Sequence, residues 1–200
     1  MRIVIAEDQG MLRGALVQLL DMEEDFLVVG QTDNGDKALA LIEETQPNLV
    51  IADIEMPGMS GLDLAEQLKN CKSQCKVVIV TTFARPGYLE RAMKANVSGY
   101  ILKDEPINDL MDHLRLIDKG GKFISPELAA SFYFSEENPL TDRECDCLRL
   151  VLSGHTTKQI SDILFLSQGT VRNYLSTAMQ KLNAGLRMEA AKKAQDNGWL

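Results

Sequence analysis

The chain has 200 residues, of which 45% are hydrophobic and 25% are charged, a composition typical of globular rather than disordered proteins. No segment approaches the roughly 18 consecutive apolar residues of a membrane span, and no cleavage site follows the short apolar run at residues 1–6, so we expect a cytoplasmic protein with no membrane partner. The net charge of −8 is uneven: residues 1–119 carry 12 basic and 20 acidic side chains, whereas residues 139–200 carry 8 and 6, a balance that permits nucleic-acid binding there.

Residues 1–103 alternate short apolar runs with helical patterns. The strand candidates, rich in Val and Ile, are Arg2–Ala6, Phe26–Gly30, Asn48–Ala52, Lys76–Thr81 and Gly99–Leu102. The helix candidates are Gly10–Asp21, Gly35–Thr45, Leu62–Asn70, Gly87–Ala95 and Ile107–Lys119. Strands that are apolar throughout are covered on both faces, so these units predict a doubly wound α/β fold with a five-stranded parallel sheet over residues 1–119.

The rest of the chain carries helical signals. Gly120-Gly121 ends the last of these helices, and residues 120–138 are interpreted as a linker with one short helix after Pro126. Thr141 and Glu144 have the spacing of a capping box. The helices predicted from there are Thr141 to about Leu152, Thr157–Leu164, Ser167 to about Leu182, and Arg187–Asn197. Residues 139–200 are therefore expected to form a small all-α domain.

The four cysteines fall in two close pairs, Cys71/Cys75 and Cys145/Cys147. A reducing cytosol argues against disulfides, and neither spacing is the Cys-x-x-Cys that zinc sites commonly use. We expect free thiols.

Polar residues interrupt the apolar runs where the predicted strands end. Glu7 and Asp8 follow the first strand, Asp53 the third, Thr81 closes the fourth and Lys103 follows the fifth. Functional residues of such sheets gather at the carboxyl ends of the strands. Three neighbouring carboxylates repel one another, and Mg²⁺ would relieve that repulsion because it prefers oxygen ligands. Asp53 could then form an aspartyl phosphate, with Thr81 supplying a hydroxyl and Lys103 a positive charge to the phosphoryl oxygens.

Each of these residues also has an ordinary structural interpretation. Asp8 could cap the following helix, Thr81 suits a strand because it is β-branched, and a lysine at a strand end is usually solvated. The combination of acids, hydroxyl and lysine at strand ends favours the functional interpretation.

Residues 1–120 resemble a response-regulator receiver domain. The resemblance is carried by Glu7-Asp8, Asp53-Ile54-Glu55-Met56-Pro57-Gly58 with Gly61, Thr81-Thr82, Gly99-Tyr100 and Lys103-Asp104. It implies that Asp53 is the phosphoacceptor of a sensor histidine kinase. It also implies that Glu7, Asp8, Asp53 and the backbone carbonyl of Glu55 bind Mg²⁺. Thr81 and Tyr100 would form the switch pair, in which the hydroxyl moves onto the phosphoryl group and the ring turns inward behind it.

Two of the C-terminal helices fit a helix-turn-helix, Thr157–Leu164 and Gln168–Leu182. The apolar stripe expected to be buried is Ile160, Ile163, Leu166, Val171, Leu175, Met179 and Leu182. The side chains left outward on the second helix are Gln168, Arg172, Asn173, Ser176 and Thr177. Arg172 and Asn173 have the side chains that read guanine and adenine, whereas phosphate contacts are expected from Lys158, Ser167, Thr170 and Lys181. The alternative is a helical protein-interaction domain with a solvated polar face.

Residues 139–198 closely resemble a LuxR-type DNA-binding domain. The matching motifs are Leu140-Thr141-x-Arg143-Glu144, Lys158-x-Ile160-Ser161 and Leu166-Ser167-x-x-Thr170-Val171-Arg172-Asn173-Tyr174. The positions that depart from the common residues of the family are Thr157, Tyr174 and Ser176, which leaves the base contacts open. A receiver joined to this domain defines the NarL/FixJ class, and residues 83–88 and Gly198-Trp199 look like a Gram-positive subgroup of it.

This resemblance implies a transcription factor that pairs as a homodimer on phosphorylation and then binds double-stranded DNA. Surplus apolar residues on the first and last receiver helices, including Met11, Val17 and Ile117, predict the dimer surface there. An aspartyl-phosphate phosphatase or phosphotransferase is the enzymatic alternative, but such enzymes usually place a second Asp where Glu55 stands. A phosphorylation-independent regulator would be favoured by a degraded acidic site, and here the site is intact.

Overall fold

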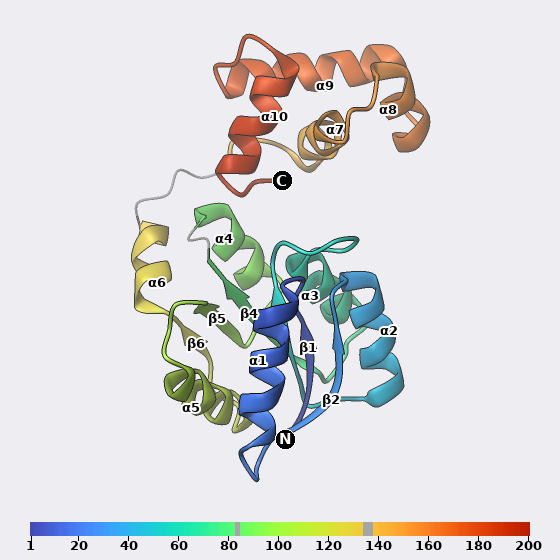
Figure 1. Ribbon diagram of the computed structural model, residues 1–200. Coiled ribbons are helices and arrows are strands. Elements are labelled where there is room, and N and C mark those ends of the chain that lie inside the picture. Colours follow the sequence, from blue (N-terminus) through green and yellow to red (C-terminus); the bar gives the residue numbers. More distant parts are fainter. Residues whose placement is uncertain (83–84, 134–137) are drawn as a thin grey trace. The chain divides into compact units, whose positions relative to one another are not determined.

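The computed structural model describes residues 1–82, 85–133 and 138–200, and its contacts divide the chain into two compact units (Figure 1). The first unit ends near residue 134, and the second is formed mainly by the residues after it. Among the described residues, no helix has both the length and the apolarity needed to cross a membrane.

The first unit is built on a parallel sheet with the strand order β2-β1-β3-β4-β5-β6. The strands are β1 (Arg2–Ala6), β2 (Leu27–Thr32), β3 (Leu49–Asp53), β4 (Lys76–Thr81), β5 (Gly99–Leu102) and β6 (Phe123–Ile124). The connecting and flanking helices are α1 (Gly10–Asp21), α2 (Gly35–Thr45), α3 (Gly61–Asn70), α4 (Pro86–Lys94), α5 (Ile107–Asp118) and α6 (Pro126–Tyr133).

The doubly wound α/β fold predicted from the sequence is confirmed, but the prediction of five strands was wrong. A sixth strand, β6, pairs with β5 in the segment that was expected to be a linker. It is only two residues long, too short for any periodic signal. Phe123 N and the following Ser125 N donate to the carbonyls of Ser98 and Tyr100 at 3.1 and 3.0 Å. The helix α6 that follows belongs to the same unit.

Helices cover both faces of this sheet (Figure 1). Alternate residues of β1, β3, β4 and β5 point to α1 and α5, where they form one core with Leu16, Leu20, Leu114 and Ile117. Gly99 lets the strand and α5 pack closely here, since a Cβ at this position would lie 2.7 Å from Ile117 Cδ1. The packing also corrects one expectation: Ile117 is fully buried and cannot belong to an exposed dimer surface.

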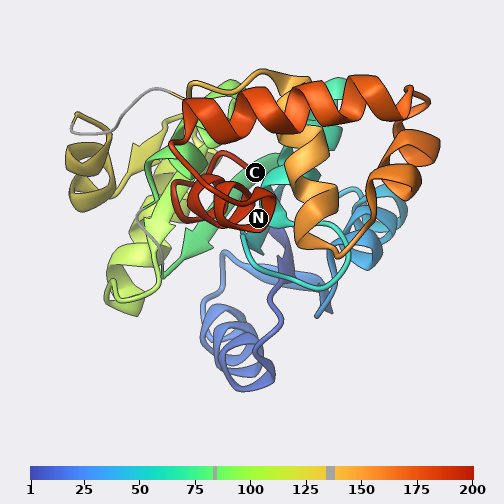
Figure 2. The same ribbon diagram turned by 90° about the horizontal axis from the view of Figure 1, so that it is seen from above.

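The second unit consists of α7 (Asp142–Leu152), α8 (Thr157–Leu164), α9 (Gln168–Lys181) and α10 (Arg187–Asp196) among its described residues. Figure 2 shows α9 lying across α7 and α10, with α8 at one end. Capping boxes start both α7 and α8, with Thr141/Glu144 and Thr156/Gln159 as the paired residues. These caps satisfy backbone donors that a helix start leaves unpaired, so short helices can begin at defined residues.

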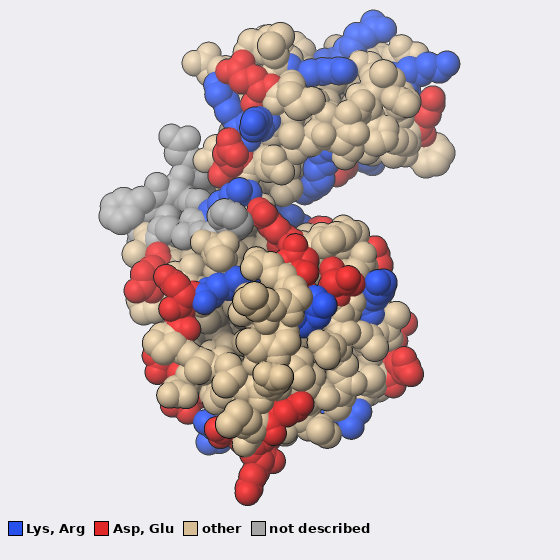
Figure 3. All heavy atoms as spheres, in the orientation of Figure 1, with Lys and Arg blue, Asp and Glu red and all other residues tan. Residues whose placement is uncertain are grey.

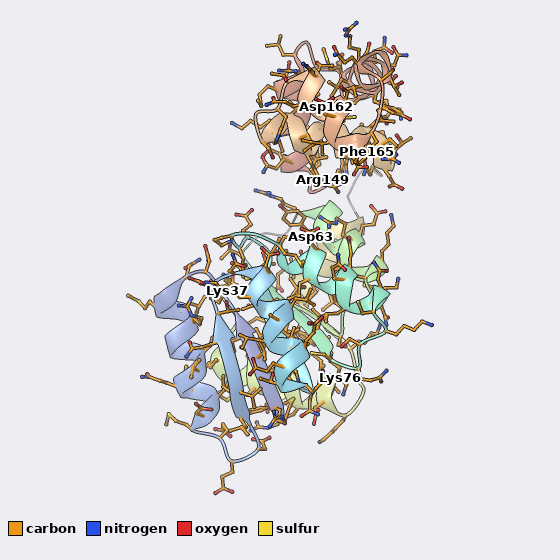
Figure 4. The ribbon with its side chains drawn as sticks, turned by 90° about the vertical axis from the view of Figure 1, so that its right-hand side faces the viewer. Lys37, Asp63, Lys76, Arg149, Asp162 and Phe165 are labelled. Atoms are coloured by element: carbon orange, nitrogen blue, oxygen red, sulfur yellow. The ribbon has the colours of Figure 1, made fainter. Side chains whose placement is uncertain are left out.

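The core of the second unit confirms most of the predicted apolar stripe. Ile160, Val171 and Leu175 are buried, and Leu166, Met179 and Leu182 pack against them. Ile163 was wrongly placed in the core: it is 45% exposed, and Ala178 is buried in the stripe instead. The neighbouring Phe165 is in the left-handed conformation that ends α8 and is 94% exposed (Figure 4).

Candidate functional site

The sheet brings three carboxylates together at the carboxyl ends of β1 and β3. One ligand oxygen from each of Glu7, Asp8 and Asp53 lies within 4.8 Å of the other two. Glu7 and Asp53 are buried, whereas Asp8 is exposed. This cluster, which is predicted from the sequence, has the donor set that Mg²⁺ prefers.

Lys103 joins two of these carboxylates. Its Nζ lies 2.8 Å from Glu7 Oε2 and 3.0 Å from Asp53 Oδ2, and only 8% of its side chain is exposed. Burial alone would favour the neutral amine, but the two carboxylates raise the pKa of Lys103 above its ordinary value. The lysine is therefore a fixed positive charge beside Asp53.

Burial raises the pKa values of both buried carboxyls. Desolvation is the main cause for Glu7 and for Asp53, and the hydrogen bond from Lys103 opposes it in each case. The single ammonium does not compensate three neighbouring carboxylates. A divalent cation at this cluster would favour their ionised forms, which fits the residues present.

The backbone of Asp53 leaves no room for a side chain at Gly61. A Cβ on Gly61, the first residue of α3, would lie 2.1 Å from the Asp53 carbonyl oxygen. A capping box formed by Ser60 and Asp63 fixes the start of this helix (Asp63 is labelled in Figure 4). The glycine therefore lets α3 begin directly against the end of β3, which explains its place in the motif.

The remaining predicted receiver residues lie around the same sheet edge. Thr81 ends β4 and is fully buried, and its carbonyl accepts from the Lys103 N–H at 2.9 Å. Tyr100 lies in β5 with no exposed surface. Glu55 is exposed two residues after Asp53.

Two contacts at the acidic cluster were not predicted from the sequence. Arg13 Nη1 donates to the Glu7 carbonyl at 2.5 Å, and Gln9 N donates to Glu7 Oε1 at 3.1 Å. Both residues lie at the start of α1 and hold the turn between β1 and α1. Their types and spacing have no motif value, so no pattern in one sequence could have identified them.

Most of the predicted DNA-facing residues are exposed on α8 and α9 of the second unit. Gln168, Arg172, Asn173, Ser176 and Thr177 are among the exposed residues of α9, and Lys158 is exposed on α8. Figure 3 shows basic side chains along the edge of this unit that carries α8 and α9. Side chains with donors and acceptors are therefore exposed on the second helix of the pair.

Three of the predicted phosphate contacts also have structural partners. Ser167 caps α9, its Oγ accepting from Thr170 N at 3.0 Å and lying 2.8 Å from Thr170 Oγ1. Lys181 Nζ donates to the buried carboxylate of Glu144 at 2.7 Å, although 31% of the lysine side chain remains exposed. That carboxylate belongs to the capping box of α7, so Lys181 has a structural role.

The cysteines are free thiols, as expected. Burial raises the pKa of Cys75 to about 12 and that of Cys147 to about 11. Because the thiolate is the reactive form, these two residues are inert at neutral pH. Among the described residues, the acidic cluster is the one group of metal-ligating side chains found.

Comparison with known proteins identifies both units. Residues 3–115 match the response regulator receiver domain family, and residues 138–194 match the bacterial regulatory proteins of the luxR family. The chain belongs to the two-component response regulators. Its two units are thus a receiver and a LuxR-type helix-turn-helix, which makes it a DNA-binding regulator of transcription.

Curated relatives and a solved structure are similar to this chain. The transcriptional regulatory protein YvfU of Bacillus subtilis is 55% identical over all of this chain and 99% of its own. The transcriptional regulatory protein DesR of the same organism is 48% identical over 98% of each chain. A crystal structure of a LuxR-family DNA-binding response regulator from Staphylococcus aureus is 47% identical, covers 58% of this chain and 98% of its own, and has a TM-score of 0.57. The predicted NarL-like family is confirmed. In sequence, the segment of residues 83–88 resembles a Gram-positive subgroup of this family. Residues 83–84 of that segment lie outside the described residues.

Proposed function

We propose that Asp53 accepts a phosphoryl group from a sensor histidine kinase in the cytoplasm, and that this modification controls dimerisation and DNA binding. The observation that supports the proposal is the cluster of Glu7, Asp8 and Asp53 with Lys103 against two of its members. When bound by Glu7, Asp8, Asp53 and the carbonyl of Glu55, Mg²⁺ supplies positive charge that neutralises carboxylate and phosphoryl oxygens.

In the proposed reaction, a carboxylate oxygen of Asp53 attacks the phosphorus of a phosphohistidine. The new P–O bond forms as the P–N bond breaks, and the histidine nitrogen takes up a proton. The Lys103 ammonium, which contacts the Asp53 carboxylate before the reaction, then pairs with a phosphoryl oxygen. The Thr81 hydroxyl donates to another, and Tyr100 packs behind it. These two residues form the two-state element that the phosphoryl group biases. No turnover of a separate substrate is proposed.

DNA binding is proposed for the surface of α8 and α9. Arg172 and Asn173 are exposed side by side on α9 and carry the side chains suited to base edges. Ser176 and Thr177 lie one turn further along the same helix. Lys158, Ser167, Thr170 and the exposed part of Lys181 are proposed to contact phosphates.

The dimer surface is proposed for the first and last helices of the receiver. Between them lies a hollow of about 180 Å³, lined mainly by apolar side chains that include Leu12, Leu19 and Ile107. Met11 on α1 is 91% exposed and Leu116 on α5 is 46% exposed. Exposed apolar residues on both helices, together with the apolar hollow between the helices, support a self-complementary contact.

Intact-mass measurement and sedimentation of the same samples test this function. With acetyl phosphate and Mg²⁺ the chain should gain one phosphoryl group and sediment as a dimer. Asp53→Ala should show neither change. Val17→Glu, which places a charge on α1, should keep the mass increase and remain monomeric, because a buried unpaired charge opposes association. Lys37→Glu on α2 is the matched control (Lys37 is labelled in Figure 4) and should dimerise.

Two results would contradict the proposal. A phosphoryl group on the Asp53→Ala variant would remove Asp53 as the acceptor. Dimers of phosphorylated Val17→Glu would place the contact on another face of the receiver.

A further inference from the structure

Ser125 links β5 of the sheet to α6 through hydrogen bonds. It is fully buried. Its N–H donates to the Tyr100 carbonyl at 3.0 Å, and its own carbonyl accepts from Leu128 N and Ala129 N at 3.0 and 3.1 Å. Those two amides belong to the first turn of α6. One residue therefore connects the strand that holds Tyr100 with the start of the helix that precedes the DNA-binding unit in the chain.

The hydroxyl of Ser125 closes a tight turn around Lys103. Its Oγ accepts from Leu102 N at 3.1 Å and donates to Glu105 Oε1. Glu105 N in turn donates to the Leu102 carbonyl at 3.3 Å. These hydrogen bonds hold residues 102–105 in one turn, and Lys103 is part of that turn.

A second contact holds Glu105 from the side of α5. The other carboxylate oxygen, Oε2, lies 3.3 Å from His113 Nε2. The His113 ring stacks on Phe123 of β6, with ring centroids 3.4 Å apart and planes at 15°. The Glu105 carboxylate is therefore fixed between the last receiver helix and the edge strand, and its side chain is only 16% exposed.

We propose that Ser125 and Glu105 transmit the state of the phosphorylation site to α6; this inference rests on the proposed function. In the structure Lys103 Nζ contacts Asp53 directly, at 3.0 Å. A phosphoryl group on Asp53 inserts between them, and the ammonium has to re-pair with its oxygens. Glu105 is two residues away in the same hydrogen-bonded turn, so the displacement reaches its carboxylate.

The consequence is a looser start of α6. When Glu105 moves, the Ser125 hydroxyl loses its acceptor inside a buried site, where an unpaired donor is unfavourable. Ser125 then no longer holds the first turn of α6 against β5. Phosphorylation would in this way release the segment that leads into the helix-turn-helix, and by linkage that segment influences the site in return.

Hydrogen–deuterium exchange of the full chain tests the proposal, with beryllofluoride and Mg²⁺ as the probe that occupies the place of a phosphoryl group. Residues 76–82 report whether the site is loaded, and residues 125–133 report α6. In the parent chain, loading should slow exchange in the first segment and speed it in α6 by roughly threefold or more, because local opening becomes easier.

Four variants separate the coupling from simple packing. Ser125→Ala and Glu105→Ala should show fast α6 exchange before loading and no further rise after it. Glu105→Gln keeps an acceptor for the hydroxyl and should respond like the parent. Lys122→Met is the matched control. It removes a hydrogen bond of 2.6 Å from Lys122, next to β6, to the Asn96 side chain, which lies outside the turn of residues 102–105. This variant should also respond like the parent.

The outcomes are distinguishable. Loading that slows residues 76–82 but leaves α6 of the parent unchanged would overturn the coupling and leave the proposed function intact. A persistent α6 response in Ser125→Ala would do the same. No response of residues 76–82 in any chain would count against the proposed function itself, and the coupling would fall with it.

Discussion

At the scale of single residues, the acidic site is a balance between burial and charge. Glu7 and Asp53 are held out of water, where an ionised carboxyl is unfavourable, and Lys103 offsets part of that cost. A divalent cation at this cluster would favour the ionised carboxylates, as the proposed function requires. The same balance predicts how substitution and pH affect stability.

Asp53→Asn should stabilise the chain in the absence of divalent cations. Burial raises the pKa of Asp53, so the native state binds a proton more tightly than the unfolded chain, where the pKa is about 3.9. The stability linked to that proton is complete below the unfolded value and is lost as pH rises through the raised native value. We expect the variant to be more stable than the parent by about 1 kcal/mol at pH 7, and the two to converge as the pH falls toward 4.

Urea unfolding across this pH range measures the difference. Mg²⁺ at pH 7 should stabilise the parent more than the variant, since ligand binding adds stability only to the state that binds it. A variant less stable than its parent at pH 7 would show that the charge of Asp53 is favourable in the fold.

The exposed residues of α9 and α8 should differ in what they recognise. Arg172→Ala is expected to weaken binding to a preferred DNA site by about 1–3 kcal/mol and to relax the preference at one base pair. Lys158→Ala should weaken binding to all sequences and reduce the salt dependence by about one unit of slope. Sites selected from random DNA, titrated at several salt concentrations, measure both effects. The reverse assignment of the two effects would contradict this division.

The sequence was sufficient for the residues whose position follows from strand ends. Asp53 and Lys103 were predicted to converge because carboxyl ends of parallel strands share one edge, and they do. Arg13 and Ser125 could not be found in this way. Their hydrogen-bond partners depend on how a helix start or an edge strand is placed in three dimensions. The residue type alone does not predict that placement.

At the scale of elements, the same distinction holds. Segments with a clear helical period, such as α1 and α8, were predicted with the bounds that the structure has. The two-residue β6 has no period to detect. Ile117 and Ile163 were assigned to the wrong environment. When a helix has more apolar residues than one stripe needs, the sequence does not determine which of them face the core.

The second unit depends on one buried carboxylate at a helix start. Glu144 is 3% exposed, accepts from Thr141 N at 2.7 Å and pairs with Lys181 at the end of α9. Burial opposes its ionisation, but these hydrogen bonds hold the pKa of Glu144 below its ordinary value. The pair therefore links α7 to α9, which also carries the proposed base contacts.

Lys181→Met should destabilise this unit by roughly 1–3 kcal/mol, because it leaves a buried carboxylate without its cation while the lysine itself is partly solvated. A depressed pKa contributes stability that is present above the unfolded value near 4.3 and is lost as pH falls through the native value. The deficit of the variant should therefore shrink below pH 4. Thermal unfolding of the variant beside Lys158→Met, an exposed control, measures it. Equal stability of the two variants at pH 7 would show that the ion pair contributes nothing.

At the scale of the whole molecule, charge and oligomeric state are connected. Residues 139–200 carry only two more basic than acidic side chains, and phosphate neutralisation dominates non-specific DNA affinity. A single DNA-binding unit is therefore expected to hold one half-site weakly. Linking two units through a receiver dimer makes the second binding event intramolecular and raises affinity with no new contact to DNA.

Phosphorylation is therefore expected to act on paired half-sites and not on single ones. For a duplex with two selected half-sites, phosphorylation should raise affinity by about 10²-fold or more, whereas for a duplex with one half-site the change should stay below about twofold. Val17→Glu should remove the gain on the paired duplex while its affinity for the single half-site stays that of the parent. Fluorescence anisotropy with both duplexes at one fixed salt concentration provides the comparison. An equal gain on the single half-site would show instead that phosphorylation frees or reshapes each DNA-binding unit on its own, with dimerisation secondary.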